Sequence, residues 1–220
     1  AIARRLAMPA STVGGRLRRL GLGRALWRAA LDHVEGCVVG LDGVAAQEDN
    51  YRRGGFELAW YNTRYQGRGR EAVVQDRRVV SLSSLPFEQL AAYDDAFHPV
   101  PRPAFLQAWI EMPQSHALGW WENGALRGYG VVRACVEGYK LAPLCADTPA
   151  IAEALFEALC ARVPSEQAVF IDAPGCNPQA TELARHQGME ATFSTARMYR
   201  GQVPQLAMSR FYGLTTLEVG

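Results

Sequence analysis

The residues best suited to chemistry lie near the start of the chain, in the run Arg18-Arg19-Leu20-Gly21-Leu22-Gly23. The apolar periodicity predicts an amphipathic helix directly after this run, over residues 24–35. Glycines let the backbone approach a diphosphate closely, and the first amides of a helix point toward a bound anion. Arginine adds charge-assisted hydrogen bonds to the same phosphates. The spacing therefore predicts a phosphate-binding loop, while a basic loop that merely precedes a helix explains the same residues equally well.

A second candidate group is the hydroxyl of Tyr51, near the end of a short polar helix expected over residues 45–53. The run Gly54-Gly55-Phe56 follows it closely. A tyrosine hydroxyl can give a proton to a leaving group, so Tyr51 is a candidate general acid. A half-buried packing role also explains a tyrosine at the end of a helix, and both interpretations stay open.

The other groups of chemical interest have simpler explanations. His98 stands in a proline-rich turn, and Asp172 and Asn177 are explained by turn and capping roles where a strand ends and a helix begins. Four aromatic residues are expected in the core rather than around a substrate: Trp109, Trp120, Trp121 and Tyr129.

The elements that position these groups occur twice in the chain. Residues 24–61 read as a helix, an apolar strand ending in Asp42, a second helix and a strand, and residues 149–199 repeat this order with Asp172 at the strand end. This repeat is longer than that of a solenoid and predicts two related α/β domains. Only the first copy follows a glycine-rich loop. The second follows Asp147-Thr148-Pro149, which brings a negative charge and lacks one amide, so we expect only the first copy to bind a cofactor.

Composition along the chain sets the expected domain boundaries. Residues 1–68 form the expected first domain, residues 69–76 a linker without apolar periodicity, and residues 77–220 the second domain. Within the second domain, Asn123-Gly124 predicts a tight hairpin turn. Residues 214–219 read as an edge strand.

The charge and the cysteines limit the classes of partner. The 220 residues carry a net charge of +1, but residues 1–28 hold seven arginines and no acidic residue, which makes them a candidate anion site. The five cysteines and four histidines are dispersed, so neither a disulfide framework nor a metal site is expected. Buried thiols in a reducing cytoplasm are expected instead. No apolar run reaches the length of about 18 residues that a membrane span needs, so no membrane partner is expected. The chain begins at Ala1 rather than Met, and a native, a truncated and a fused start all stay open.

The loop, the helix after it and the segment from Tyr51 to Phe56 resemble the acetyl-CoA half of a GNAT-type N-acetyltransferase. In that family an Arg/Gln-x-x-Gly-x-Gly/Ala loop binds the cofactor pyrophosphate, and a tyrosine before Gly-Phe protonates the leaving thiolate. The resemblance implies that acetyl-CoA is the co-substrate, that the acceptor is an amine of a small molecule or peptide, and that Tyr51 is catalytic. The cofactor-binding residues that it implies are Arg18, Arg19, Leu20, Gly21, Leu22, Gly23 and Arg24.

Residues 77–220 are similar to the second domain of a tandem bacterial GNAT subfamily, through residues 127–133, 139–144, 172–177 and 188–199. The fold that this implies is α/β, with two GNAT-like acyl-CoA N-acyltransferase domains, the first truncated at its N-terminus. A domain without its first strands exposes a sheet edge, which favours a homo-oligomer.

Residues 1–22 also resemble a helix-turn-helix of the transposase type. In that resemblance Ser11 caps the second helix, and Thr12 and Arg16 face a DNA groove. The alternative function is therefore a DNA-binding segment fused to a catalytically inactive GNAT-like body, with nucleic acid as the less favoured partner. Binding of acyl-CoA, and a salt-sensitive shift of duplex DNA, distinguish the two functions.

Overall fold

The computed structural model of the chain describes residues 21–71 and 76–217. Its helices and strands are, in chain order, α3 (Leu22–His33), β1 (Val39–Val44), α4 (Glu48–Arg53), β2 (Glu57–Arg68), β3 (Val79–Ser81), α5 (Phe87–Asp94), α6 (Pro103–Ile110), β4 (Ser115–Glu122), β5 (Ala125–Ala134), β6 (Tyr139–Ala146), α7 (Pro149–Cys160), β7 (Ala168–Pro174), α8 (Pro178–His186), β8 (Glu190–Arg200) and β9 (Phe211–Gly213). Short 3-10 turns are η1 (Ala45–Gln47), η2 (Leu82–Ser84), η3 (Asp95–Phe97) and η4 (Met208–Arg210).

The chain forms two compact units, residues 1–39 and residues 40–220. The described part of the first unit is mainly helix α3, which lies where the sequence predicts a helix. Trp27, Leu31 and Val34 are partly buried, whereas most other residues of α3 are exposed. These three residues follow helical spacing, so the predicted apolar face is confirmed at these positions.

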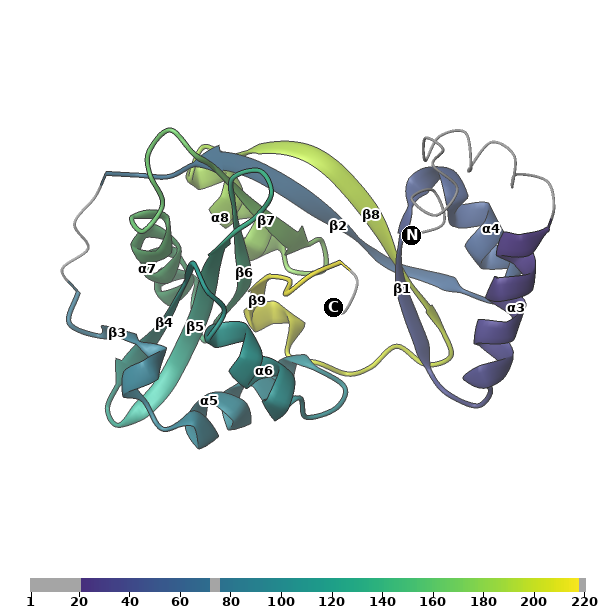
Figure 1. Cartoon of the computed structure of the whole chain (residues 1–220), viewed down its shortest axis with the longest axis horizontal. Helices are drawn as coiled ribbons and strands as arrows, with labels where there is room; N and C mark the ends of the chain where they lie inside the picture. Colours follow the sequence, from purple (N-terminus) through teal and green to yellow (C-terminus); the bar gives the residue numbers. More distant parts are fainter. Residues whose placement is uncertain (1–20, 72–75, 218–220) are drawn as a thin grey trace, which may run out of the picture. The chain divides into compact units, whose positions relative to one another are not determined.

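The described strands of the second unit belong to one mixed sheet, with the order β1-β8-β2-β7-β6-β5-β4-β3 and with β9 paired to β6 (Figure 1). Strand β2 precedes residues 69–76 in the chain, yet it pairs antiparallel with both β7 and β8, which follow them. The expected linker therefore does not separate two sheets. Its first residues are bonded to the same body, since the Gly69 amide donates to the Gln167 carbonyl at 3.0 Å.

The repeat seen in the sequence has a structural counterpart in the four strands at the β1 end of this sheet. In the strand order β1-β8-β2-β7, β1 of the first repeat corresponds to β7 of the second, and β2 corresponds to β8. Exchanging the corresponding strands gives the same order read from the other end. The two long strands β2 and β8 lie side by side, and Asn62 faces Thr195 in their register. Each repeat thus places its long strand beside the shorter strand of the other repeat.

Two ion pairs connect the repeats across these exchanged strands. Asp172 on β7 accepts hydrogen bonds from Arg64 Nε and Nη2 of β2 at 2.8 and 3.0 Å. Asp42 on β1 accepts one from Arg197 Nη1 of β8 at 2.6 Å. Both carboxylates are fully buried, so each ion pair contributes specificity to the pairing of a strand from one repeat with a strand from the other.

Helix α7 packs on β5 at very short range because two strand residues there are glycines. A Cβ atom at Gly128 would lie 3.0 Å from Leu155 Cδ1, and one at Gly130 would lie 2.7 Å from Leu159 Cδ1. Both leucines are fully buried in the larger hydrophobic cluster, which lies under α7 and α8. The predicted hairpin turn is also confirmed, since Asn123 and Gly124 both have positive φ, at 52° and 75°.

The C-terminal segment differs from its prediction. The strand there is β9, which pairs with β6, and residues 214–217 are not extended in a strand; residues 218–220 lie outside the described part. The amide of Leu214 donates to the Asp172 carbonyl of β7 at 2.9 Å, and Asn177 Nδ2 donates to the Phe211 carbonyl at 3.0 Å. The sequence predicted an edge strand over residues 214–219. Instead, β9 and Leu214 lie between β6 and β7, where these two strands diverge and their backbone groups bond to the C-terminal segment.

Candidate active site

The predicted phosphate-binding loop is described from Gly21 onward; Arg18, Arg19 and Leu20, like most of the helix-turn-helix-like stretch, lie outside the described residues. Gly21 is the N-cap of α3 with a left-handed φ of 72°, and Leu22, Gly23 and Arg24 form the first turn. No side chain caps this helix start, and its first turn has no acidic residue. The first amides of α3 thus meet no capping side chain, which is the arrangement that suits an anion at a helix start.

Space at the two glycines is consistent with close approach of a ligand. No heavy atom of the described residues lies within 4 Å of a Cβ built at Gly21 or Gly23. The two glycines are therefore open to a ligand as far as the described residues extend. Arg24 is exposed beside it.

Tyr51 lies in α4 with its ring against the end of β1. A Cβ atom at Gly43 would lie 2.8 Å from Tyr51 Cδ2 and even closer to Cε2, so only glycine at this position accommodates the ring. The Tyr51 carbonyl accepts hydrogen bonds from the amides of Gly54 and Phe56, at 2.9 and 3.1 Å, which end the helix. The sequence singled out Tyr51 but not Gly43, although Asp-Gly at the end of a strand is a signal of a close approach.

The buried carboxylate of Glu48 holds α4 in place. It accepts a hydrogen bond from the Tyr61 hydroxyl of β2 at 3.0 Å and one from Arg52 Nη2 at 2.8 Å. The hydrogen bond to Glu48 raises the pKa of Tyr61, because it stabilises the protonated hydroxyl. Glu48 was not predicted as a site residue, and its role is to fix the helix that carries Tyr51.

The residue before Gly43 is held by the network that joins the two repeats. Asp42 accepts hydrogen bonds from Asn62 Nδ2 at 2.5 Å, from Thr195 Oγ1 at 3.1 Å and from Arg197. Arg197 in turn donates to the Tyr199 hydroxyl at 3.0 Å. Because every partner of Asp42 comes from β2 or β8, the end of β1 that contacts Tyr51 is positioned by both repeats.

At the corresponding helix start in the second repeat, which is the start of α7, side chains of the protein take the place that a phosphate would need. Asp147 accepts hydrogen bonds from the Tyr93 hydroxyl and from Arg210 Nη1, both at 2.9 Å. Thr148 caps α7 by accepting from the Ile151 amide at 3.3 Å. An open α/β sheet normally binds ligands beyond the carboxyl ends of its parallel strands, but here β9 lies between β6 and β7 at that place. This geometry supports the expectation that the second repeat binds no phosphate cofactor.

The remaining candidates lie mainly in the interior. Tyr129 and Trp120 are core residues as expected, while Trp109 and Trp121 are only partly buried. His98 lies in a bend, as expected, and is buried there, with Nε2 3.5 Å from Asp94 Oδ1. Asn177 caps α8 by accepting from the Gln179 amide at 3.2 Å, as expected.

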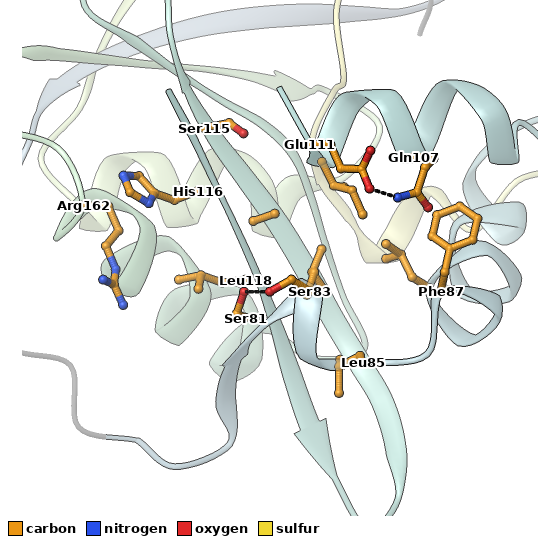
Figure 2. Close-up of a pocket in the computed structure, with 14 residues that line it drawn as sticks. Ser81, Ser83, Leu85, Phe87, Gln107, Glu111, Ser115, His116, Leu118 and Arg162 are labelled. Carbon is orange, nitrogen blue, oxygen red and sulfur yellow. Dashed lines mark hydrogen bonds between the residues drawn. The ribbon is translucent and has the colours of Figure 1, made fainter. Parts of the chain in front are cut away.

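A cavity of about 510 Å³ lies between β4, η2 and helices α5 and α6 (Figure 2). Its wall includes Leu85 and Phe87, and its polar groups include Glu111, His116 and Arg162. Burial and the nearby charge of Arg162 lower the pKa of His116, which favours the neutral imidazole. None of the predicted site residues lines this cavity, and we do not assign the reaction to it.

All five cysteines are free thiols: Cys145 and Cys160 are buried as expected, whereas Cys37, Cys135 and Cys176 are exposed. No cluster of three or more His, Cys, Asp or Glu side chains arranged for a metal occurs in residues 21–71 and 76–217. Within the same part of the chain, no helix combines the length and the apolar character that a membrane span requires.

The fold and these positions define the class to which the protein belongs. Residues 90–213 match the family model described as an acetyltransferase (GNAT) domain. The chain is also 30% identical over 203 residues to the holothin acyltransferase of Pseudoalteromonas sp. (strain SANK 73390), covering 92% of this chain and 69% of that relative. The chain therefore belongs to the GNAT acetyltransferase family and is an enzyme.

Solved structures agree on the fold. A putative acetyltransferase from Pyrococcus horikoshii superposes with a TM-score of 0.77 at 22% identity, covering 94% of this chain and 69% of that one. A GCN5-related N-acetyltransferase from Sphaerobacter thermophilus superposes with a TM-score of 0.58 at 14% identity, covering 87% of this chain and 73% of that one. These structures support one α/β GNAT-like fold, and they do not confirm the arrangement of two GNAT-like domains that the resemblance implied.

Proposed function

We propose that this enzyme transfers an acetyl or other acyl group from acyl-CoA to an amine, and that the first repeat carries the chemistry. The observation that supports this most is the difference between the two helix starts. Helix α3 begins on Gly21 without a capping side chain, whereas α7 begins beside Asp147, which is already paired with Arg210. An anionic cofactor is favoured at the first start and opposed at the second.

In this proposal, residues 18–24 bind the pyrophosphate of acyl-CoA, with Arg18, Arg19 and Arg24 supplying positive charge. Bound acyl-CoA supplies the thioester. The amine nitrogen attacks the thioester carbonyl, the carbon–nitrogen bond forms, and the carbon–sulfur bond breaks. The leaving thiolate takes a proton from the Tyr51 hydroxyl, which acts as a general acid. The nitrogen loses its surplus proton to solvent water, and the Tyr51 phenolate regains a proton from water, so the products are the amide and the free CoA thiol. The tandem interpretation also belongs to the proposal: residues 77–220 form a second GNAT-like half that positions the first half without binding cofactor.

The acceptor in this proposal is a small-molecule amine, because the relative of 30% identity is by its name an acyltransferase of holothin. A peptide amine is the other acceptor consistent with the family. We propose the cytoplasm as the site of action, because free thiols suit a reducing compartment.

The test is an assay of thiol release from acetyl-CoA and longer acyl-CoA thioesters in the presence of a panel of small amines and peptides. We expect acceptor-dependent release, with binding of acyl-CoA measurable by calorimetry. The proposal is wrong if no thioester binds and none is consumed with any acceptor.

Replacing Tyr51 by phenylalanine should lower turnover by about 10²–10⁴-fold while leaving the affinity for acyl-CoA unchanged. The reason is that the substitution removes one proton donor and little surface. Tyr139→Phe, a partly buried tyrosine of β6, is the matched control and should keep wild-type turnover. Steady-state kinetics and calorimetry measure the two quantities, and unchanged turnover in Tyr51→Phe would remove the residue from the mechanism.

Gly43→Ala should lower turnover through Tyr51. The new methyl group would overlap the Tyr51 ring, so the ring has to leave its place against β1. Because both substitutions then act on the same group, the double variant Gly43→Ala/Tyr51→Phe should be no slower than Tyr51→Phe alone. Additive losses in this double-mutant cycle would show that Gly43 acts independently of Tyr51.

A further inference from the structure

A second cavity, of about 460 Å³, lies in the unit formed by residues 40–220 and is called here the Lys140 cavity. Strands β2, β5, β6 and β7 and the segment 215–217 contribute its walls. Its charged groups include Lys140 and Asp172, and its apolar walls include Phe170 and Leu217. It shares no residue with the loop at α3 or with Tyr51, so it is separate from the site proposed above.

The ammonium group of Lys140 is buried in this cavity and shares its counter-ion with another residue. Lys140 is the single lysine of the sequence, and it is only 6% exposed. It forms an ion pair with Asp172, but the same carboxylate also accepts both hydrogen bonds from Arg64. One carboxylate therefore serves two cations. Apart from this ion pair, Lys140 Nζ has no hydrogen-bond partner among the described residues.

A third cation faces the same cavity. Arg133 lines it from β5, and its Nε is buried without a hydrogen-bond partner in the described part of the chain. Its guanidinium stacks over Trp109, with Cζ 4.9 Å from the ring centre, which orients the group without neutralising it. Among the described residues that line the cavity, three are cations and two are acids, namely Asp172 and the exposed Glu137.

The titration of Lys140 agrees with this count. Burial lowers the pKa of Lys140 to about 8, and the charge of Asp172 only partly opposes that effect. A buried donor without a full set of partners is costly to the folded protein. A bound anion would remove this cost, because it would accept hydrogen bonds from Lys140 Nζ and Arg133 Nε.

We propose that the Lys140 cavity binds a small organic carboxylate. Lys140 Nζ and Arg133 Nε, two buried donors that line the same cavity, supply hydrogen bonds for the two oxygens of a carboxylate. The cavity is within the usual volume of small-molecule sites, and Phe170 and Leu217 offer apolar surface to a carbon chain. Affinity should therefore rise with the length of the chain attached to the carboxylate.

The single lysine makes a direct experiment possible. In protein labelled with ¹⁵N-lysine, the side-chain signal belongs to Lys140 alone, and it can be followed while acetate, butyrate, hexanoate, octanoate or inorganic phosphate is added. We expect a saturable shift with the longer carboxylates, weaker with acetate, and a rise in the pKa of Lys140 when the carboxylate binds. Calorimetry on the wild-type chain gives the affinities independently.

Variants distinguish this cavity from other sites. Lys140→Met and Arg133→Gln should each lower the affinity for hexanoate at least ten-fold, and Arg127→Gln, an exposed arginine on the same strand β5, should leave it unchanged. If Lys140→Met does not fold, Arg133→Gln carries the test alone. The proposal is overturned if none of the carboxylates shifts the Lys140 signal at about 10 mM, if only phosphate does, or if the two cavity variants bind as well as the wild type.

Discussion

Gly23→Asp should lower the affinity for acyl-CoA by about one to three orders of magnitude. A carboxylate at position 23 would face the diphosphate across a few ångströms, and the repulsion between two near-surface charges at that range costs about 1–4 kcal/mol. The folded protein should tolerate the change. Position 23 is exposed in the first turn of α3, where an acidic residue interacts favourably with the helix dipole. The affinity for acyl-CoA should thus fall while the stability of the folded protein does not, which distinguishes this variant from one that merely unfolds.

Calorimetry with acetyl-CoA measures the affinity, and circular dichroism checks the fold. Ala29→Asp is the matched control, because it adds the same charge to an exposed position of α3 away from the helix start. The control should bind acyl-CoA almost as well as the wild type. The same titration tests whether the second repeat binds acyl-CoA, because it would then still bind in the Gly23→Asp variant. The full chain is used because β2 lies between β7 and β8 in the sheet. Full affinity in the Gly23→Asp variant would place the cofactor somewhere other than the start of α3.

Asp94→Ala should destabilise the protein by about 3–5 kcal/mol. Asp94 is 1% exposed and accepts hydrogen bonds from Arg102 Nε and Nη2, at 2.8 and 2.9 Å. The fully buried Tyr129 hydroxyl donates to the same carboxylate. Removing the carboxylate leaves a largely buried guanidinium without its counter-ion and a buried hydroxyl without its acceptor. Asp95→Ala, at the exposed neighbouring position, should change stability by no more than about 0.5 kcal/mol.

The pH dependence of this difference has a definite sign. Burial alone would raise the pKa of Asp94, but the hydrogen bonds from Arg102 and His98 outweigh burial and hold the pKa well below its usual range. A carboxyl group with a depressed folded-state pKa stabilises the protein above its unfolded pKa, about 3.9, and this contribution is lost as the pH falls further. Urea unfolding of wild type and Asp94→Ala should therefore show a constant difference near neutral pH that narrows below about pH 4. Equal stability of the two proteins at pH 7 would contradict the role of Asp94.

The sequence was sufficient for features that depend on neighbouring residues. The helix after residue 23, its partly buried face at Trp27, Leu31 and Val34, and the turn at Asn123-Gly124 all follow from periodicity or from backbone preference over a few positions. The difference between the two helix starts was predictable for the same reason, because Gly21 and Asp147 act on amides and charges within one turn of themselves. The family resemblance was carried by such local segments as well.

Only the tertiary structure decided which strands meet. Arg64 and Asp172 are 108 residues apart, and Asp42 and Arg197 are 155 apart, yet each pair forms an ion pair across exchanged strands. The apolar pattern of a strand determines which face is buried but does not name the strand beside it. The same reason explains why the turn at His98 did not reveal that this side chain is buried beside Asp94. It also explains why a strand was expected over residues 214–219, whereas the strand that forms is β9, which pairs with β6. Burial and charge pairing at these positions arise from segments distant in the chain, so they become defined only when the whole sheet has formed.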